Sequence, residues 1–276
     1  MVEKLLWLCL AVVRCTLMEA RANSLRVRIH DSDLCMPHTL SPDSNNLLSA
    51  LPVQDKVRWH SHLVPVELQS GQVLHETGCV VPYAYFPTTA IVSSIYPMEN
   101  GATVEVAEVG REGFVGVSLV LGGDTAISRA VVRKQGYALR ICGVHLRRQL
   151  DDSVVASHLF LRYIQAYIMH ATQAAACARL HSLEQQFCSW LLSTLDRQHD
   201  NKIFITQEQI ANLLGVRRKR VTLSALKIQD AGLISYTRGC IVVMDRTGLE
   251  NQCCECYAVV KRGYDTVLAA LQNAQV

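Results

Sequence analysis

The sequence predicts an α+β protein with an N-terminal antiparallel β-roll of the jelly-roll kind, a long dimerisation helix and a C-terminal winged helix-turn-helix. Three observations carry this prediction. Short β-type segments alternate with glycines, a long segment repeats apolar residues at helical spacing, and two short capped helices precede a pair of strands. A chain of 276 residues is long enough for about two domains.

Residues 1–43 are expected to be an extension, either disordered or a non-native start of the chain. An apolar stretch at 5–13 follows Lys4, and the Ala-Arg-Ala sequence at 20–22 resembles a cleavage site, so the segment has the outline of a signal peptide. Arg14 interrupts the apolar segment, and the positively charged region that precedes a signal peptide's apolar core is weak in this chain. Both features disfavour secretion. Residues 24–46 carry little pattern and are expected to be loop.

The composition favours a cytoplasmic protein. The eleven cysteines are irregularly spaced in a long chain, which is typical of reduced intracellular thiols rather than of a disulfide framework. No apolar run in the sequence reaches the length of a membrane span, so no membrane partner is expected. The net charge of +3 is too small to indicate a partner unless it is clustered.

Residues 44–150 are predicted to form the β-roll, which would act as a sensor domain. Short helices should come first, with five apolar positions: Leu47, Leu48, Leu51, Val57 and Trp59. Seven strands should follow: Val64–Leu68, Gln72–Glu76, Tyr83–Phe86, Thr89–Tyr96, Thr103–Val109, Ala126–Lys134 and Tyr137–Ile141. Many short strands with even turn spacing are typical of an antiparallel barrel or jelly roll. The sequence contains no acid–base or nucleophile constellation, so we predict no catalytic residues and disfavour an enzyme.

Residues 151–181 are predicted to form the dimerisation helix. Its apolar and small residues alternate spacings of three and four: Val154, Ser157, Leu161, Ile164, Ile168, Ala171, Ala175 and Ala178. This heptad seam predicts a coiled-coil partner, and hence a homodimer. A helix that packs only on the β-roll of its own chain is the alternative.

Residues 182–276 are predicted to form the winged helix-turn-helix domain with a C-terminal helix. Ser182 and Gln185 have capping-box spacing at the start of an amphipathic helix, and Thr206 and Gln209 repeat it at the start of a shorter one. Gly215 should end that shorter helix, because glycine adopts the left-handed conformation of a helix C-terminus without strain. A second helix should then begin after a tight turn.

The second helix, expected at about 217–231, is strongly basic at its start. Val221, Ala225 and Ile228 share one face and should be buried. Four consecutive cations at 217–220 oppose the helix dipole, whereas a phosphate backbone would stabilise them. Between positions 202 and 238 there are seven Lys or Arg and two acidic residues, a local net charge of +5. A solvated basic run is the alternative interpretation.

Two short strands, 233–236 and 240–243, should form the wing around Thr237-Arg238-Gly239. Arg238 at the tip is a candidate phosphate contact, with an ordinary exposed turn arginine as the alternative. The predicted DNA-binding residues are Thr206, Gln207, Arg217, Arg218, Lys219, Arg220, Thr222 and Arg238. The predicted partner is double-stranded DNA, and the effector is unknown.

The cysteines of the tail admit a metal site or a redox switch. Cys253, Cys254 and Cys256 lie within four residues, and Cys177 and His181 could share a helix face. The tail has no CxxC pair and no adjacent histidine to complete a tetrahedron, while residues 259–271 follow an amphipathic helical pattern. Helix packing is therefore the favoured role, and neither a metal nor a cofactor is predicted.

The order of these motifs resembles the Crp/Fnr family of bacterial transcription regulators. The resemblance covers about 46–244 and is carried by four stretches: GREGFVG at 110–116, GDTAISRAVV at 123–132, ITQEQIANLLGVRRKRV at 205–221 and AGLI at 231–234. It implies a cyclic-nucleotide-binding-like β-roll, a dimerisation helix and a winged helix-turn-helix on a palindromic operator. It also implies RNA polymerase as a partner.

Several positions depart from that family pattern. Cyclic-AMP-responsive members hold the phosphate with a Glu and an Arg, where this chain has Val117 and Ser128, so cyclic AMP is not expected to bind. Iron–sulfur members carry a closely spaced N-terminal cysteine cluster, a spacing that this chain lacks: the cysteines before the roll are Cys9, Cys15 and Cys35.

The recognition helix also departs from the family. The family's Arg-Glu pair corresponds to Arg218-Lys219, and a further Arg corresponds to Leu223. Lys219 cannot accept a hydrogen bond from cytosine as a Glu does, so a different operator is expected. A ligand-sensing or scaffold protein with a degenerate DNA-binding module is the alternative function.

Overall fold

The computed structural model of the chain describes residues 41–198 and 200–272. The signal-like segment and Cys9, Cys15 and Cys35 lie outside these residues. No helix in the described part of the chain is both long enough and apolar enough to cross a membrane.

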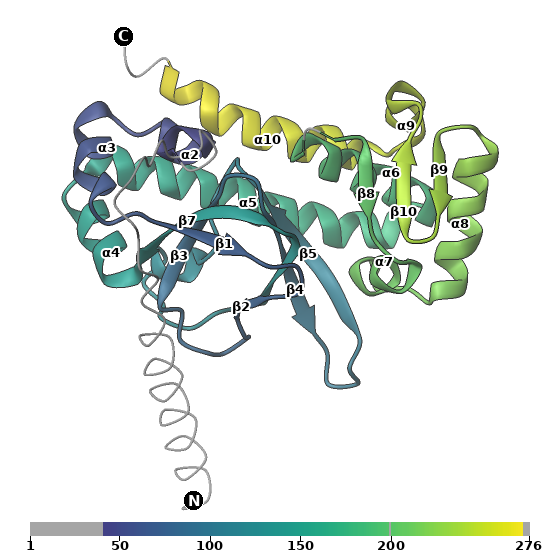
Figure 1. Ribbon diagram of the computed structural model, residues 1–276, viewed down its shortest axis with the longest axis horizontal. Coiled ribbons are helices and arrows are strands. Elements are labelled where there is room, and N and C mark those ends of the chain that lie inside the picture. The colour runs from purple at the N-terminus through teal and green to yellow at the C-terminus, as the bar shows by residue number, and fades with distance from the viewer. Residues whose placement is uncertain (1–40, 199, 273–276) are drawn as a thin grey trace, which may run out of the picture. The chain divides into compact units, whose positions relative to one another are not determined.

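Two antiparallel sheets form the predicted β-roll (Figure 1). One sheet has the order β1-β7-β3, from β1 (Val64–Leu68), β7 (Gly136–Cys142) and β3 (Tyr83–Pro87). The other has the order β2-β6-β4-β5, from β2 (Val73–His75), β6 (Arg129–Lys134), β4 (Ile91–Pro97) and β5 (Thr103–Val109). All seven predicted strands are confirmed, with ends that differ by at most three residues. A 3-10 turn, η3 (Val117–Leu119), lies between β5 and β6.

The roll begins with a 3-10 turn and two short helices, η2 (Pro42–Ser44), α2 (Asn46–Ser49) and α3 (Val53–His60). Asn45 is fully buried: its side chain caps α2 and donates to the carbonyl oxygens of Pro87 and Gly113. The prediction of loop up to residue 46 is therefore wrong at its end, because this asparagine joins the N-terminal helices to the roll. Val57, one of the apolar positions from which these short helices were predicted, is 73% exposed.

The long helix α5 (Val154–Leu180) follows α4 (Gly143–Asp151) and packs on the roll through an aromatic cluster. The ring centroid of Phe160 lies 5.3 Å from that of Trp59 and 4.9 Å from that of Phe114. Gly113 is required beside this cluster, because a Cβ atom there would clash with the ring of Tyr163.

The predicted seam of α5 is divided between two faces. Ile164 is buried in the core of its own roll. Val154, Leu161 and Ile168 are 68%, 48% and 55% exposed, and they lie at intervals of one heptad on the other face. The helix therefore packs on its own roll and still presents an apolar stripe to the outside.

The C-terminal domain has a second apolar core. Its elements are α6 (Leu183–Asp196), β8 (Lys202–Phe204), α7 (Gln207–Leu214), α8 (Arg218–Asp230), β9 (Ile234–Thr237), β10 (Cys240–Val243) and α9 (Arg246–Gln252). The wing is a sheet of three strands in the order β8-β10-β9, of which β8 was not predicted. A three-residue strand has too few residues to show alternation.

The last helix, α10 (Glu255–Gln272), does not stay with the winged domain. It runs back along α5 (Figure 1), and Tyr264 and Val267 are buried in the core of the β-roll. The sequence grouped this helix with the winged helix-turn-helix because it follows it in the chain. An amphipathic pattern identifies the buried face of a helix but not the surface that covers it.

Candidate nucleic-acid interface

The first helix of the motif, α7, begins with a complete capping box. Thr206 Oγ1 accepts from the backbone N–H of Gln209, and the Gln209 side chain accepts from the backbone N–H of Thr206. Ile205, just before the capping residue, and Ile210, in the first turns of the helix, are both buried. The helix ends at Gly215, which has a φ of +64° in the left-handed region.

The second helix, α8, buries the predicted face. Val221 and Ile228 are at most 1% exposed and belong to the core of the C-terminal domain. The opposite face carries Leu223 and Leu226, which are both exposed. Apolar side chains on a recognition helix can contact the methyl group of thymine.

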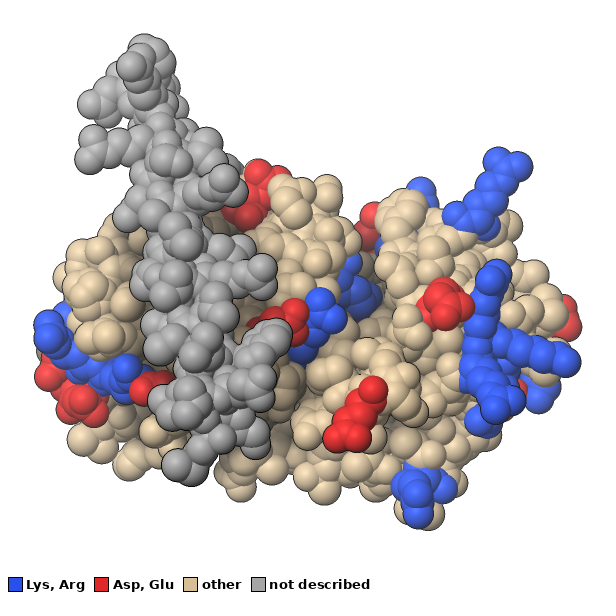
Figure 2. Space-filling model, turned by 90° about the horizontal axis from the view of Figure 1, so that it is seen from below, with Lys and Arg blue, Asp and Glu red and all other residues tan. Residues whose placement is uncertain are grey.

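The four cations at the start of α8 are all exposed. Arg217 is the N-cap residue without a side-chain capping bond, and Arg218, Lys219 and Arg220 form the first turn. No carboxylate among the described residues pairs with any of the four within 4.0 Å. Lys and Arg side chains gather on the side of the molecule that carries α8, at the right of Figure 2. These charges face solvent and are available to an anion.

Thr222 holds the two helices together. Its hydroxyl donates to Oε1 of Gln207, 2.7 Å away, and lies 3.2 Å from the carbonyl oxygen of Arg218. Both predicted contact residues are thereby fixed relative to each other. The geometry assigns Thr222 a positioning role, because its hydroxyl proton is already engaged.

The wing is tied to the start of α7. The backbone N–H of Ile205 donates to the carbonyl oxygen of Gly239 at 2.8 Å, and the hydroxyl of Tyr236 donates to the carbonyl oxygen of Ile205 at 2.9 Å. Gln229 of α8 accepts from the backbone N–H of Tyr236. The wing, α7 and α8 are therefore joined as one unit.

Arg238 forms the tip of the wing with Gly239. Their φ values are +48° and +78°, and the strands pair directly on either side of them, as in a two-residue turn with left-handed central residues. Arginine rarely adopts this conformation. The structure thus holds an exposed arginine at a strained turn beside the predicted DNA-binding helices.

A small cavity lies beside Val117 and Ser128, the two positions at which this chain departs from the pattern of cyclic-AMP-responsive members. Val117 and Ser128 are both buried, and with Phe114 and Tyr167 they line a cavity of only about 20 Å³. Sites for small molecules have volumes of roughly 300–1,000 Å³. Arg129, the neighbouring cation, forms an ion pair with Glu76 at 3.2 Å. The cavity is large enough for about one water molecule.

A larger cavity of about 300 Å³ lies where the roll meets the C-terminal domain. Buried charges surround it. Arg197 of α6 donates from Nε to Glu112 at 2.7 Å and lies 3.5 Å from Glu108 of β5. Arg133 of β6 pairs with Glu108 and lies over the ring of Trp190, 5.2 Å from its centroid. This ion network was not predicted, because strand alternation does not reveal that a carboxylate is buried at an interface between domains.

Burial changes the acid–base properties of this network. It raises the pKa of Glu105, and the charge of Arg133 opposes that rise. Burial also lowers the pKa of Arg133 to about 10, although the charge of Glu105 acts in the opposite direction. Burial thus opposes the charged forms of Glu105 and Arg133, and the attraction between the two charges favours them.

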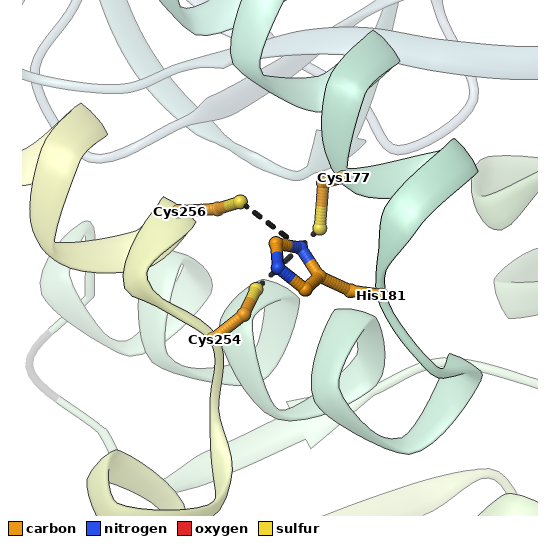
Figure 3. Close-up of side chains that lie close together, drawn as sticks. All are labelled: Cys177, His181, Cys254 and Cys256. Carbon is orange, nitrogen blue, oxygen red and sulfur yellow. Dashed lines mark hydrogen bonds between the residues drawn. The ribbon is translucent and has the colours of Figure 1, made fainter.

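The cysteines of the tail do not pack separately from His181. Cys177, His181, Cys254 and Cys256 converge, with their four ligand atoms all within 4.8 Å of one another (Figure 3). The prediction that these thiols lack a histidine is therefore wrong. The i, i+4 spacing of Cys177 and His181 was the available signal, but the sequence did not show that the tail returns to the end of α5.

Comparisons with known proteins agree with this architecture. Residues 185–252 match the Crp-like helix-turn-helix domain model. No curated protein matches the chain.

Solved structures resemble most of the described architecture at low sequence identity. A transcriptional regulator of the Crp/Fnr family from Eubacterium rectale has a TM-score of 0.60 at 18% identity, over 76% of this chain and 98% of its own. FixK2 from Bradyrhizobium japonicum has a TM-score of 0.61 at 14% identity, over 70% and 98%. The c-di-GMP-responsive global regulator CLP from Xanthomonas campestris has a TM-score of 0.56 at 16% identity, over 70% and 100%. Residues 185–252 are therefore a Crp-like helix-turn-helix domain, and the chain has the fold of the Crp/Fnr transcription regulators.

Proposed function

We propose that this protein is a sequence-specific DNA-binding transcription regulator that acts as a homodimer on a palindromic operator. The observation that carries the proposal is the run of exposed, unpaired cations at the start of α8, in the second helix of a Crp-like helix-turn-helix domain. Such a run destabilises its own helix through the helix dipole. A phosphate backbone compensates for that cost, because each neutralised phosphate releases counterions.

Different residues would contribute position and specificity. Arg217 and Arg220, together with Arg238 on the wing, are suited to phosphate contacts from two sides of the same unit. Arg218 and Lys219 lie in the first turn of α8, from which recognition helices reach base edges. Thr206 and Gln207 would add backbone and side-chain contacts at the start of α7.

The apolar stripe on α5 supports the homodimer. Val154, Leu161 and Ile168 are exposed at heptad spacing, and Ala175 continues the series. A second copy of α5 would cover this stripe in the manner of a coiled coil. Two recognition helices in a dimer would then lie about one DNA turn apart, as palindromic half-sites require.

The small cavity in the roll supports a regulator that does not respond to cyclic AMP. The small cavity beside Val117 and Ser128 lacks both the volume and the free cation that a cyclic phosphate requires. An effector that regulates the protein would have to bind at another site.

DNA binding is tested by selection of fragments from random duplexes, followed by affinity measurements at several salt concentrations. Neutralising Arg217, Arg218, Lys219 and Arg220 to Gln should make the plot of log affinity against log salt less steep by about 3 to 4. Substituting Gln for the exposed Arg148 and Arg262, which lie on other surfaces, should leave the slope unchanged. Equal affinity of the parent and the four-fold variant would refute the proposal.

The dimer is tested by sedimentation equilibrium. Leu161→Glu with Ile168→Glu should dissociate the dimer, since charges at the centre of a helix seam are not compensated. The matched control is Arg162→Glu, at an exposed position on the same helix that is not three or four residues from any member of the stripe. A parent chain that sediments as a monomer at micromolar concentration would contradict the homodimer.

A further inference from the structure

Four possible metal ligands from distant parts of the chain meet at the bend between α5 and α6 (Figure 3). Cys177 lies in the last turns of α5, and His181 is the residue that ends this helix. Cys254 and Cys256 come from the link between α9 and the start of α10. The site therefore joins the long helix to the segment that leaves the winged domain.

The distances between ligand atoms are those of a tetrahedral site for one ion. The sulfur atoms of Cys177 and Cys254 are 3.5 Å apart, and the sulfur of Cys256 is 3.4 Å from Nδ1 of His181. Zinc–sulfur bonds of about 2.3 Å and zinc–nitrogen bonds of about 2.0 Å give tetrahedral edges of roughly 3.8 Å and 3.6 Å. No separation among the four ligand atoms exceeds 4.8 Å, about 1 Å above the longer of these edges.

A packing role does not account for these thiols. Cys177, Cys254 and Cys256 are 8%, 4% and 5% exposed. They form a buried cluster of their own, separate from the two large apolar cores of the described chain. A cysteine that only fills space is expected to have apolar neighbours, and a metal ligand is expected to have other ligands.

Polar groups around the cluster are placed to support a bound ion. Nε2 of His181 lies 3.3 Å from the carboxylate of Glu255, which would fix the proton on Nε2 and leave Nδ1 free to bind metal. Gln173 donates from Nε2 to the sulfur of Cys256 at 3.1 Å, and Ser189 lies 3.3 Å from the sulfur of Cys254. Hydrogen bonds from such donors stabilise thiolates.

We propose that Cys177, His181, Cys254 and Cys256 bind one Zn²⁺ ion in a closed Cys₃His site. Three thiolates and one imidazole suit zinc, and four protein ligands leave no position open for substrate, so the site would be structural. Zinc binding would release the three thiol protons to solvent and form three Zn–S bonds and one Zn–N bond. An iron–sulfur cluster would hold its ligands on different iron atoms, and the four ligand atoms lie too close together for that.

The zinc ion would hold the DNA-binding domain in position relative to the long helix. Without it, α5 and α6 are joined at this point by the bend at His181-Ser182, by their direct contacts, which include the hydrogen bond from Gln186 to the carbonyl oxygen of His181, and by the packing of α10. A bound ion adds two cross-links from the segment that follows the wing. The orientation of α8 relative to α5 would then depend on zinc occupancy and on the oxidation state of the thiols.

The metal content of the full chain tests this assignment without DNA. Protein expressed in zinc-supplemented medium and then dialysed should contain about one zinc per chain by mass spectrometry. Cys177→Ser, His181→Ala, Cys254→Ser and Cys256→Ser should each reduce zinc affinity by more than the roughly 10–100-fold that is typical when a residue hydrogen-bonded to a metal ligand is lost. Glu255→Gln, at such a residue, should fall within that range.

Two matched variants separate ligand loss from misfolding. His181→Cys should keep one zinc per chain, because it replaces one zinc ligand with another. Cys253 is next to Cys254 in the chain, but the Cys253 thiol donates to the carbonyl oxygen of Glu250 and does not belong to the cluster. The Cys253→Ser variant should therefore also keep the ion. Cobalt substitution of the parent chain should give the visible absorption of tetrahedral cobalt thiolate, and His181→Ala should lack it.

Three results would overturn the proposal. Parent protein with less than about 0.1 zinc per chain and no cobalt spectrum would show that no such site forms. Equal zinc content in the parent and in the Cys254→Ser variant would place the ion elsewhere. A native disulfide between Cys177 and Cys254 under reducing purification would assign the pair to thiol chemistry instead. None of these readouts depends on whether the protein binds DNA.

Discussion

The start of α8 and the junction between the domains are both rich in arginine. At α8 the charges are exposed and unpaired, whereas at the junction they are shielded from solvent and paired. At α8, four consecutive cations lie in solvent with no carboxylate beside them. At the junction, Arg133 and Arg197 are buried and paired with Glu108 and Glu112. An unpaired surface charge can bind something outside the chain, whereas a buried pair links parts of the chain to each other.

This difference also predicts how each region contributes to stability. Removing a charge from the junction leaves its partner buried and unpaired. Removing a charge from the start of α8 relieves repulsion from the helix dipole. Substitutions in the two regions should therefore change the free energy of unfolding in opposite directions.

The largest effect is expected at the junction. Arg197→Ala should lower the free energy of unfolding by about 3–5 kcal/mol, because Glu112 would lose its ion-pair partner and the buried Glu108 would keep only Arg133. The control is Arg246→Ala, which breaks a half-exposed ion pair with Asp196 and should cost less than about 1 kcal/mol. Urea unfolding measures both. A similar loss for the two variants would mean that burial does not distinguish them.

A second effect is expected from His170, which lines the junction cavity. Burial, with a smaller contribution from the charge of Arg197, lowers its pKa to about 3. The folded chain therefore keeps this histidine neutral, while the unfolded chain takes up a proton below about pH 6.5. The free energy of unfolding is therefore unaffected by His170 titration above pH 6.5, and it decreases as the pH falls from 6.5 towards 3.

The measurement is urea unfolding between pH 7 and pH 4.5. Above pH 6.5 the stabilities of the parent and of His170→Gln should run parallel. Below it the parent should lose about 1 kcal/mol more per pH unit than the variant, which cannot titrate. Parallel curves across the whole range would show that His170 takes up its proton in the folded state.

The smallest effect is expected at the start of α8, and its sign is reversed. Neutralising Arg217, Arg218, Lys219 and Arg220 should stabilise the folded chain by about 1 kcal/mol at low salt, because these cations oppose the helix dipole. Added salt should reduce this gain through screening. Thermal unfolding at two salt concentrations measures it. If the four-fold variant is less stable than the parent, the charges have an internal partner and the contrast with the junction fails.

Much of the fold was predictable because its signals are local. The capping boxes at Ser182 and Thr206, the left-handed Gly215 and the seven strands of the roll each depend on residues a few positions apart. The buried face of α8 follows in the same way from the spacing of Val221, Ala225 and Ile228. Interactions of short range in sequence leave a pattern that can be read without the structure.

The remaining features depend on where separate segments meet. Asn45 is buried because its side chain spans the start of α2 and two backbone carbonyl groups more than 40 residues away. Val57 contributes to the apolar pattern of a short helix, yet its side chain is exposed, because the pattern does not show which apolar positions the rest of the chain covers. The burial of Glu108 depends on contact with α6, which no pattern within β5 could reveal.

By itself, the sequence determined the fold class, the boundaries of most helices and strands, and the clustered positive charge on α8. Only the tertiary structure decided that α10 returns to the roll, that the cavity beside Val117 and Ser128 is small, and that Cys177 and His181 meet Cys254 and Cys256. The physical reason is the range of the interactions. Helix caps, turns and periodicity act between neighbours in the chain, whereas packing, cavities and ligand clusters are set by contacts between residues far apart in it.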